Sequence, residues 1–338
     1  MSHMKINILF DFNSIRAPWK SSKFLRDLRN FFEQEDVYTT IPDKADVILF
    51  YNHYCIEEVI KIKRLYPNKI FIHKIDGPLK FIDNKNDKLD DLIFTANHLV
   101  ADGTVFQSEW SKIKCFEQGL SSSPIDTVIL NAPDPAIFFK KEKNISRKKK
   151  IISVCYAPFI NKGIDILAFL DEKLDFNKFE ITYVGDSPVT FKHIRLLRGL
   201  TDTEWAEELW SHDFFLAPSL DDPCPVSLAE AFKCGLPAIV RDSGAYPEIL
   251  GASGLLFNGT EDVLSKINTL SGQNGLASEN EALYDFDLVS HSYLSFMAGV
   301  YSDAAEDHYW PKKINFLKSA KLKKIRKSLL LNENEFLE

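Results

Sequence analysis

The chain has 338 residues, which at about 100–200 residues per domain predicts two domains. Hydrophobic residues make up 45% of it and charged residues 26%, a globular composition that excludes disordered, fibrous and low-complexity classes. Lys and Arg number 41 and Asp and Glu number 48, so the net charge is −7, which disfavours general binding to nucleic acid.

Short apolar runs alternate with amphipathic stretches in the first half of the chain. The strand candidates are Ile6–Phe10, Val47–Tyr51, Ile70–His73, Gly103–Gln107 and Thr127–Leu130. The helix candidates are Ser22–Phe32, Glu57–Tyr66 and Glu109–Gln118. In the first helix candidate Phe24, Leu25, Leu28 and Phe32 recur at helical spacing. This alternation predicts a parallel sheet with helices on both faces.

The charged run at 140–150 predicts a solvated linker, with a basic patch facing a polyanion as the alternative. The pattern then restarts. The second half offers the strand candidates Lys150–Tyr156, Phe179–Val184, Phe214–Ala217 and Ala238–Arg241. It offers the helix candidates Ile164–Leu170, Thr203–Trp210, Val226–Cys234, Gly244–Leu250, Thr260–Leu270 and Leu288–Gly299.

Two α/β units of similar size follow from this pattern. We predict doubly wound, Rossmann-like parallel-sheet domains at 1–142 and 143–287, then a returning helix and a basic helical tail at 288–338. Two such domains would face each other across a cleft at the carboxyl ends of their strands, where open α/β sheets bind ligands.

Several common active-site motifs are missing from the sequence. There is no GxGxxG after the first strand candidate, no GxxxxGK[ST], no GxSxG and no HExxH, which disfavours dehydrogenases, P-loop NTPases, serine hydrolases and zinc proteases. The Asp285-Phe-Asp287 motif stands just before a helix candidate, so we interpret Asp285 as a helix cap and expect no metal site. The five cysteines form no CxxC pair, which predicts reduced thiols in a cytoplasmic protein.

The stretch from Pro218 to Glu248 carries the clearest chemistry. A loop with Asp221 and Asp222 follows a strand candidate, and a helix begins near Val226 or Ser227, where unpaired N–H groups and a partial positive charge suit a phosphate. Glu230, which we place in the first turn of that helix, could accept two hydroxyls of a ribose or a sugar. The small residues around Gly244 could approach the same phosphate.

This stretch resembles the family 4 retaining glycosyltransferases with the GT-B fold. Their signature is Glu-x7-Glu, an Ala-rich helix, Gly-x-Pro, a strand and a Gly-rich loop ending in Pro-Glu. The matching residues are Asp222, Glu230, Ala231, Gly235, Pro237, Gly244, Pro247 and Glu248. Further segments resemble the family along nearly the whole chain, among them 155–163 with its Lys162-Gly163 pair, 183–186, 128–138 and 73–78.

The resemblance implies a role for each matched residue. Glu230 would hold the nucleotide ribose, Asp222 would contact hydroxyls of the donor sugar, and Lys162 would neutralise the diphosphate. The N–H groups of Val226 and Ser227, with Gly244, would bind donor phosphate or sugar. Backbone near Arg198 and Leu200 would hold the base, and His73 and Asp76 would lie at the acceptor face. His73 could instead be a core histidine, because it ends an apolar strand candidate.

The sequence departs from the family pattern at four places. The first acid is Asp222 rather than Glu, and Ala157 stands where the family often has an Arg. The early Gly-Gly is replaced by Lys20-Ser-Ser22, and Asn-Gly-Val-Asp is replaced by Asn131-Ala-Pro-Asp134. The cation missing at Ala157 would have to come from elsewhere, for instance from Arg241 or Lys20. These departures keep open an inactive GT-B module that binds a glycan or a partner.

The tail is basic. From Lys312 to Lys327 there are eight Lys or Arg residues and no acid. We consider two interpretations: a helix that contacts an anionic membrane surface, and a packed or solvated helix. No apolar run reaches 18 residues and no signal peptide precedes Lys5, so we expect a cytoplasmic protein. If the tail contacts a membrane, we expect it to attach the protein to the inner face of the cell membrane.

These patterns together predict an enzyme. We expect transfer of a sugar from a nucleotide-diphosphate sugar to a hydroxyl of a glycan or lipid-linked glycan, with retention, and without a metal or other cofactor. A bacterial surface polysaccharide is the acceptor that the resemblance and the tail suggest. A sugar-nucleotide hydrolase or epimerase on the same fold is the second enzymatic hypothesis.

Overall fold

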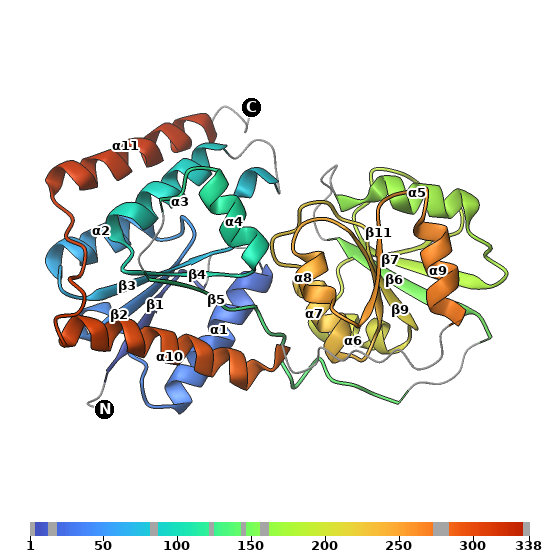
Figure 1. Ribbon diagram of the computed structural model, residues 1–338, viewed down its shortest axis with the longest axis horizontal. Helices are drawn as coiled ribbons and strands as arrows, with labels where there is room; N and C mark the ends of the chain where they lie inside the picture. The colour runs from blue at the N-terminus through green and yellow to red at the C-terminus, as the bar shows by residue number, and fades with distance from the viewer. Residues whose placement is uncertain are drawn as a thin grey trace. The chain divides into compact units, whose positions relative to one another are not determined.

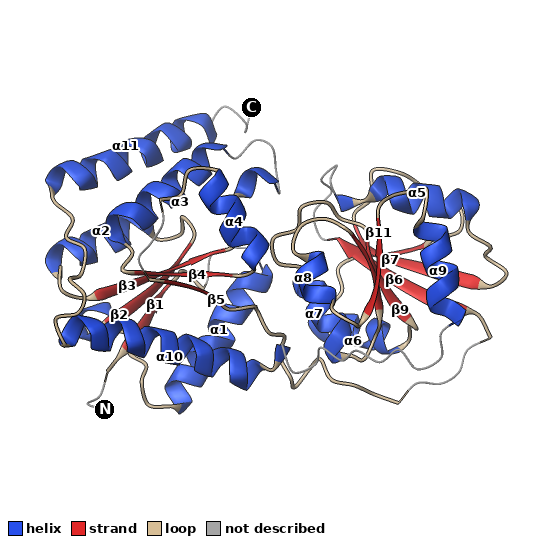
Figure 2. Cartoon of the chain, in the orientation of Figure 1, coloured by secondary structure: helices blue, strands red, loops and turns tan. Residues whose placement is uncertain are grey.

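The computed structural model describes residues 4–12, 19–81, 87–121, 125–142, 147–155, 162–272 and 284–333. The chain forms two compact units. Unit 1 contains Met1–Leu130 and Asp287–Glu338, and unit 2 contains Asn131–Phe286. Within each unit helices flank a central sheet (Figure 2). Residues 131–142, which we predicted in the first domain, lie in unit 2, and residues 288–338 lie in unit 1.

The sheet of unit 1 has five parallel strands. They are β1 (Ile6–Leu9), β2 (Val47–Tyr51), β3 (Ile70–Ile75), β4 (Gly103–Phe106) and β5 (Asp126–Val128), hydrogen-bonded in that order. All residues of β1 to β4 are buried, as expected for strands covered on both faces. A single bridge from Ile6 to Tyr38 extends the sheet beyond β1.

Helices cover both faces of this sheet. They are α1 (Trp19–Gln34), α2 (Ile56–Leu65), α3 (Asp87–Val100), α4 (Glu109–Glu117), α10 (Phe286–Ala305) and α11 (Phe316–Glu333). α1 and α10 lie on one face, and α2, α3 and α11 lie on the other (Figure 1). α10 contacts α1 through an aromatic pair, Phe24 with Tyr293, whose ring centroids are 5.8 Å apart. The predicted returning helix therefore packs on the first Rossmann-like sheet.

The sheet of unit 2 has six parallel strands in the order β11-β10-β9-β6-β7-β8. Their bounds are β6 (Lys149–Cys155), β7 (Phe179–Gly185), β8 (Arg195–Leu197), β9 (Phe214–Ala217), β10 (Ala238–Arg241) and β11 (Gly254–Phe257). The chain moves outward from β6 to β8 and then resumes at β9 on the other side of β6. The order of the strands therefore reverses between β6 and β9, which makes this the topological switch point of the sheet.

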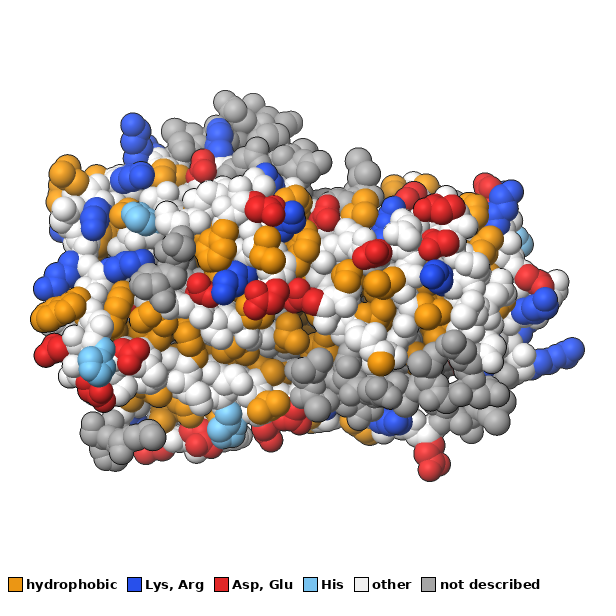
Figure 3. All heavy atoms as spheres, in the orientation of Figure 1, with side chains coloured by type: hydrophobic (Ala, Val, Ile, Leu, Met, Phe, Trp, Pro, Cys, Tyr) orange, Lys and Arg blue, Asp and Glu red, His pale blue; other side chains and the backbone are white. Residues whose placement is uncertain are grey.

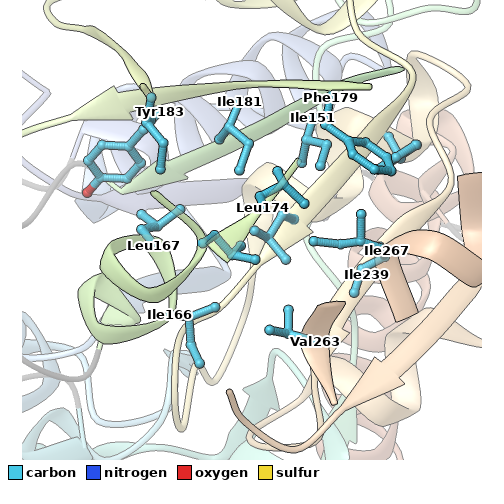
Figure 4. Close-up of a cluster of buried hydrophobic side chains, with 14 of the residues drawn as sticks. Ile151, Ile166, Leu167, Leu174, Phe179, Ile181, Tyr183, Ile239, Val263 and Ile267 are labelled. Atoms are coloured by element: carbon cyan, nitrogen blue, oxygen red, sulfur yellow. The ribbon is translucent and has the colours of Figure 1, made fainter. Parts of the chain in front are cut away.

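The helices of unit 2 are α5 (Ile164–Lys173), α6 (Asp202–Trp210), α7 (Val226–Lys233), α8 (Tyr246–Leu250) and α9 (Val263–Gly272). α5 and α9 contribute Leu167 and Ile267 to one core with Ile151, Ile181 and Ile239 of the sheet (Figure 4). The start of the predicted linker lies on the surface, as expected: Lys140, Lys141 and Glu142 are exposed, and the Lys141 ammonium lies over the Trp210 ring. No disulfide joins the five cysteines, all of which the structure describes.

Candidate functional site

Lys162 and Asp222 meet at the switch point of unit 2. Lys162 stands just before α5, in the connection that follows β6, and Asp222 lies in the loop that follows β9. The Lys162 Nζ is 3.3 Å from the Asp222 Oδ2, and both side chains are largely buried. The Asp222 carboxylate raises the pKa of Lys162, so the ammonium stays charged. Two residues that the sequence singled out separately thus form one charge pair.

Two glycines allow the backbone to approach this pair closely. Gly163 has a φ of +76°, and a Cβ there would lie 2.4 Å from the Cβ of Pro218. Gly244 has a φ of +63°, and a Cβ there would lie 2.6 Å from both the nitrogen and the oxygen of Asp222. The next residue, Ala245, donates its N–H to the Asp222 carbonyl at 2.9 Å. Gly244 therefore supports the Asp222 loop from the β10 side.

The loop is held by side chains as well. Asp221 has a φ of +51°. Its N–H donates to the Ser243 hydroxyl at 3.0 Å, and that hydroxyl donates to the Asp221 carboxylate at 2.9 Å. The second oxygen of Asp222, Oδ1, accepts the N–H of Cys224 at 3.1 Å. The Asp222 carboxylate is thus oriented by a backbone donor on one oxygen and by Lys162 on the other.

α7 begins where the sequence predicted, at Val226, after a Pro225 cap that makes no side-chain hydrogen bond. The Val226 N–H is already used, because it donates to the Cys224 carbonyl at 2.8 Å. This corrects the prediction that Val226 offers its N–H to a phosphate. Ser227 keeps its predicted place in the first turn of the helix, where the helix dipole favours an anion.

Glu230 differs from expectation in position and exposure. It is the fifth residue of α7, beyond the first turn, and only 2% of it is exposed. Its Oε2 accepts the indole N–H of Trp205 at 2.8 Å. Glu230 is therefore a buried carboxylate with a partner on α6. Trp205 is a site residue that the sequence analysis missed.

Arg198 and Leu200 follow β8, beside the end of β7. The Arg198 Nε donates to the Asp186 carboxylate at 3.0 Å, and both side chains are more than half exposed. Leu200 is half-buried. Both residues thus lie at the carboxyl edge of the unit 2 sheet, two strands away from the Lys162–Asp222 pair.

Arg241 supplies a second cation near the pair. It ends β10, and its Nη1 donates to the Pro218 carbonyl at 3.4 Å and lies 3.7 Å from the Asp165 carboxylate. Its buried Nε has no hydrogen-bond partner among the residues that the structure describes. Ala157, where the family cation is missing, and the side chain of Lys20, the other candidate to replace it, lie outside the described part of the chain.

His73 belongs to the core of unit 1. It has no exposed surface and stacks on Phe50, with ring centroids 4.1 Å apart. Its Nε2 is 2.8 Å from the Asn52 carbonyl, and its Nδ1 is 3.3 Å from the Asn97 amide nitrogen. Burial lowers the pKa of His73 to about 3. This corrects the predicted acceptor contact, because a side chain closed in on all sides does not reach a ligand.

Asp76 follows β3 and collects several polar partners. The Tyr51 hydroxyl donates to its carboxylate, the buried Lys74 ammonium lies 3.2 Å from Oδ1, and the Asn52 side chain accepts its N–H at 3.2 Å. Desolvation, aided by the charge of Asp76, raises the pKa of the nearby Tyr54 to about 12. Tyr51 and Asn52 were missed, although Asn52-His53-Tyr54 directly follows a buried strand. The carboxyl edge of unit 1 thus carries a hydroxyl- and amide-rich cluster around one carboxylate.

Two observations bear on metals and membranes. Among the described residues no group of His, Cys, Asp and Glu side chains is arranged to hold a metal ion. No helix in the described ranges has the length and apolar character needed to cross a membrane.

Comparison with known proteins relates this chain to sugar-transferring enzymes. Residues 150–273 match the model of the family Glycosyl transferases group 1. A sulfoquinovosyl transferase from Arabidopsis thaliana is 29% identical in an alignment of length 126 that covers 33% of this chain and 24% of that protein. The match thus spans about a quarter of the relative's length and falls short of two thirds of either chain.

Solved structures are similar over most of the chain. Sucrose-phosphate synthase from Thermosynechococcus elongatus has a TM-score of 0.71 at 11% identity, over 88% of this chain and 99% of that one. HepE from Anabaena, solved with UDP and glucose, has a TM-score of 0.68 at 14% identity, over 88% of this chain and 100% of that one. These likenesses confirm the predicted GT-B class of fold, with two parallel-sheet units and C-terminal helices, and residues 150–273 carry a group 1 glycosyl transferase domain.

Proposed function

We propose that this protein transfers a sugar from a nucleotide-diphosphate sugar to a hydroxyl of a glycan or lipid-linked glycan. The observation that carries the proposal is the Lys162–Asp222 pair at the switch point of unit 2, 3.3 Å apart, inside the domain that matches the glycosyl transferase model. Open α/β sheets bind nucleotides at this place. The complex of HepE with UDP and glucose supports a UDP-sugar as the first donor to test.

Lys162 and Asp222 would bind different parts of the donor because their charges are opposite. The ammonium of Lys162 suits the diphosphate, on which negative charge grows as the bond to the sugar breaks, while the carboxylate of Asp222 suits sugar hydroxyls. Without donor the two side chains neutralise each other. A bound diphosphate would pair with Lys162 in place of Asp222. The Asp222 Oδ2 would then be available to the sugar, while Oδ1 still accepts the Cys224 N–H.

The remaining donor contacts follow from geometry. The first turn of α7 presents its positive end beside Asp222, and Arg241 stands on the neighbouring strand β10. Glu230 is the residue that we assign to the ribose, with Trp205 holding its buried carboxylate in place. The exposed Arg198 and the backbone near Leu200 would border the base.

We further propose that transfer retains the anomeric configuration and needs no metal ion. Lys162 and Arg241 can neutralise the leaving diphosphate without a metal ion, and that diphosphate can then accept the proton of the acceptor hydroxyl on the same face of the sugar. Catalysis would rest on positioning and charge stabilisation, so no protein nucleophile is required. On the acceptor side, Asp76 with Tyr51 and Asn52 offers hydrogen bonds to sugar hydroxyls.

Ligand-induced stabilisation tests the donor site. Thermal unfolding with UDP, GDP, ADP, CDP and dTDP should show one nucleotide that stabilises the protein by about 2.7 kcal/mol at 100 times its dissociation constant. The same nucleotide should fail to stabilise Lys162→Met. A lack of stabilisation by every nucleotide would contradict the donor assignment and favour an inactive glycan-binding module.

Product analysis then tests the reaction. Sugar conjugates of the nucleotide identified above are incubated with lipid-linked and soluble glycan acceptors, with and without a chelator, and the anomeric configuration of the product is read by NMR. We expect a retained linkage and a rate that the chelator leaves unchanged. Free sugar or an epimer formed without acceptor would instead identify the hydrolase or epimerase hypothesis as correct.

A further inference from the structure

α11 packs on unit 1 with one side only. Leu322 has no exposed surface and joins the core formed by α2 and α3, together with Ile314 from the segment before the helix. Ser319 is also buried, at 2%. The inner side of α11 is thus occupied by the protein itself, so the helix cannot bury that side in another partner without leaving the core.

The outer side of α11 is cationic. Six lysines on the helix or just before it are exposed: Lys313, Lys318, Lys321, Lys323, Lys324 and Lys327. No acidic residue occurs between Lys312 and Lys327 to offset them. Figure 3 shows Lys and Arg side chains over α11 in the upper left of the view. A run of like charges on a packed helix disfavours the folded state through self-repulsion, and an anionic partner would relieve that repulsion.

A basic groove continues this surface toward α2. It has a volume of about 750 Å³, and its charged lining consists of Lys61, Arg64, Lys323, Arg326, Lys327 and Glu57. Glu57, the one acid in this lining, forms an ion pair with Arg326. The groove therefore presents an excess of positive charge between two helices of the same unit.

Large apolar side chains are exposed beside these cations. Phe316 and Leu317, at the start of α11, are 72% and 75% exposed, and Trp310 shortly before the helix is 73% exposed. Leu65, at the end of α2, lines the groove and is 62% exposed. Exposed aromatic and aliphatic side chains next to lysines are typical of surfaces that lie in the membrane interface.

We propose that this surface docks on an anionic lipid bilayer. The α11 docking surface comprises the exposed lysines of 313–327, the groove cations Lys61 and Arg64, and the apolar residues Trp310, Phe316, Leu317 and Leu65. The cations bind lipid phosphates, and the apolar side chains enter the headgroup region. A soluble polyanion matches the charges equally well but gains nothing from Phe316 and Leu317, and this difference favours the bilayer.

This inference goes beyond the proposed transfer reaction and does not depend on it. It also joins the two interpretations of the tail: the helix is packed by its inner side and available to a membrane by its outer side. Vesicle binding is measured without nucleotide sugar or acceptor, so failure to bind lipid and failure to transfer sugar are separate outcomes.

Vesicle sedimentation tests the proposal with the full-length protein. We expect binding to phosphatidylglycerol vesicles and not to phosphatidylcholine vesicles, with weaker binding at higher salt. Lys323→Glu/Lys327→Glu should lower the partition coefficient at least about 25-fold, because each cation lost near an anionic surface costs about fivefold. The matched control Lys178→Glu/Lys192→Glu changes two exposed lysines of unit 2 by the same charge and should bind as the parent does.

A second variant separates lipid from other polyanions. Phe316→Ser/Leu317→Ser should lower binding to phosphatidylglycerol vesicles while binding to soluble polyphosphate stays unchanged, and thermal unfolding should match the parent because both side chains are exposed. The proposal would be overturned by no binding to phosphatidylglycerol, by an equal loss in the control, or by an apolar variant that binds vesicles as well as the parent does.

Discussion

The indole Nε1 of Trp205 donates a hydrogen bond to the Glu230 Oε2 at 2.8 Å, and both side chains are buried between α6 and α7. This contact fixes the orientation of the carboxylate that we assign to the donor ribose. A hydrogen bond to a charged group contributes about 1.5–3 kcal/mol, which is enough to matter for both stability and donor binding. Trp205 is therefore a positioning residue in our proposal.

Replacing Trp205 by Phe tests this role. The variant keeps an aromatic ring in the core and removes the N–H, so the donor KM should rise about 10-fold or more with a smaller change in kcat. The control is Trp210→Phe, which removes the indole N–H that donates to the Phe139 carbonyl. Equal kinetic effects in the two variants would show that Trp205 acts only on the fold.

Replacing Glu230 by Gln tests the ribose contact itself. The amide oxygen can still accept the Trp205 N–H, so the unfolding temperature should stay near that of the parent, while donor binding weakens because the charge is lost. Glu230→Ala is the less informative change, because it leaves a buried indole N–H without an acceptor at a cost of about 1–3 kcal/mol. Parent-like donor affinity in Glu230→Gln would contradict the assignment.

The sequence predicted the regular part of the fold well. The bounds of β2, β9 and β10 match the predicted ranges, and all four apolar positions of the first helix are buried. β8 and β11, the two edge strands of the unit 2 sheet, were missed; most of their residues are half-buried or exposed, so they lack the buried pattern of the central strands. α3 was also missed, although its hydrophobic residues Leu92, Ile93, Leu99 and Val100 are buried.

The candidate site was predictable only in part. The resemblance singled out Lys162 and Asp222, but local patterns contain no information on a contact between residues in two distant loops. The same limit explains Trp205, which reaches Glu230 from another helix. His73 illustrates the opposite error: its spacing to Asp76 suggested a ligand contact, whereas its place inside β3 buries it in the core.

Removing either member of the Lys162–Asp222 pair should change the affinity for the nucleoside diphosphate, but in opposite directions. Lys162→Met should weaken binding of the nucleoside diphosphate and lower kcat/KM about 10²–10³-fold, because it removes charge stabilisation. Asp222→Asn should tighten binding of the nucleoside diphosphate, because the carboxylate no longer competes for Lys162, and should still lower transfer. Calorimetric titration of both variants with the nucleoside diphosphate measures these changes in affinity. The control is Glu208→Gln, which removes the ion pair between Glu208 and Arg195 in the same unit. Weaker diphosphate binding in Asp222→Asn would refute the competition.

Within unit 1, the carboxylate of the buried Lys63–Asp102 ion pair also holds the C-terminal segment. The Asp102 Oδ2 is 2.8 Å from the Lys63 Nζ, with both side chains fully buried, and its Oδ1 accepts the Lys312 N–H at 2.7 Å and the Tyr309 hydroxyl at 3.1 Å. Removing one partner of such a pair costs about 3–5 kcal/mol. We expect Asp102→Asn to lower the free energy of unfolding by that amount in urea titrations, whereas Asp36→Asn, at an exposed pair with Lys5, should change it by less than about 0.5 kcal/mol.

The burial of His73 should make the free energy of unfolding depend on pH. Burial, the largest cause, lowers the pKa of His73 to about 3, against about 6.5 in the unfolded chain. As the pH falls below 6.5 the unfolded state binds a proton that the folded state does not, so the free energy of unfolding should fall toward pH 3. The slope should be about 1.4 kcal/mol per pH unit for this residue.

Urea titrations between pH 7.5 and 5 measure this slope. His73→Gln keeps a donor for the Asn52 carbonyl and an acceptor for the Asn97 amide, and it should reduce the slope by about one proton. His308→Gln, at a mostly exposed histidine, serves as control and should leave the slope unchanged. His53, whose pKa burial lowers to about 4, should account for a further part of the slope that persists in His73→Gln. An undiminished slope in His73→Gln would mean that His73 is not a source of the acid sensitivity.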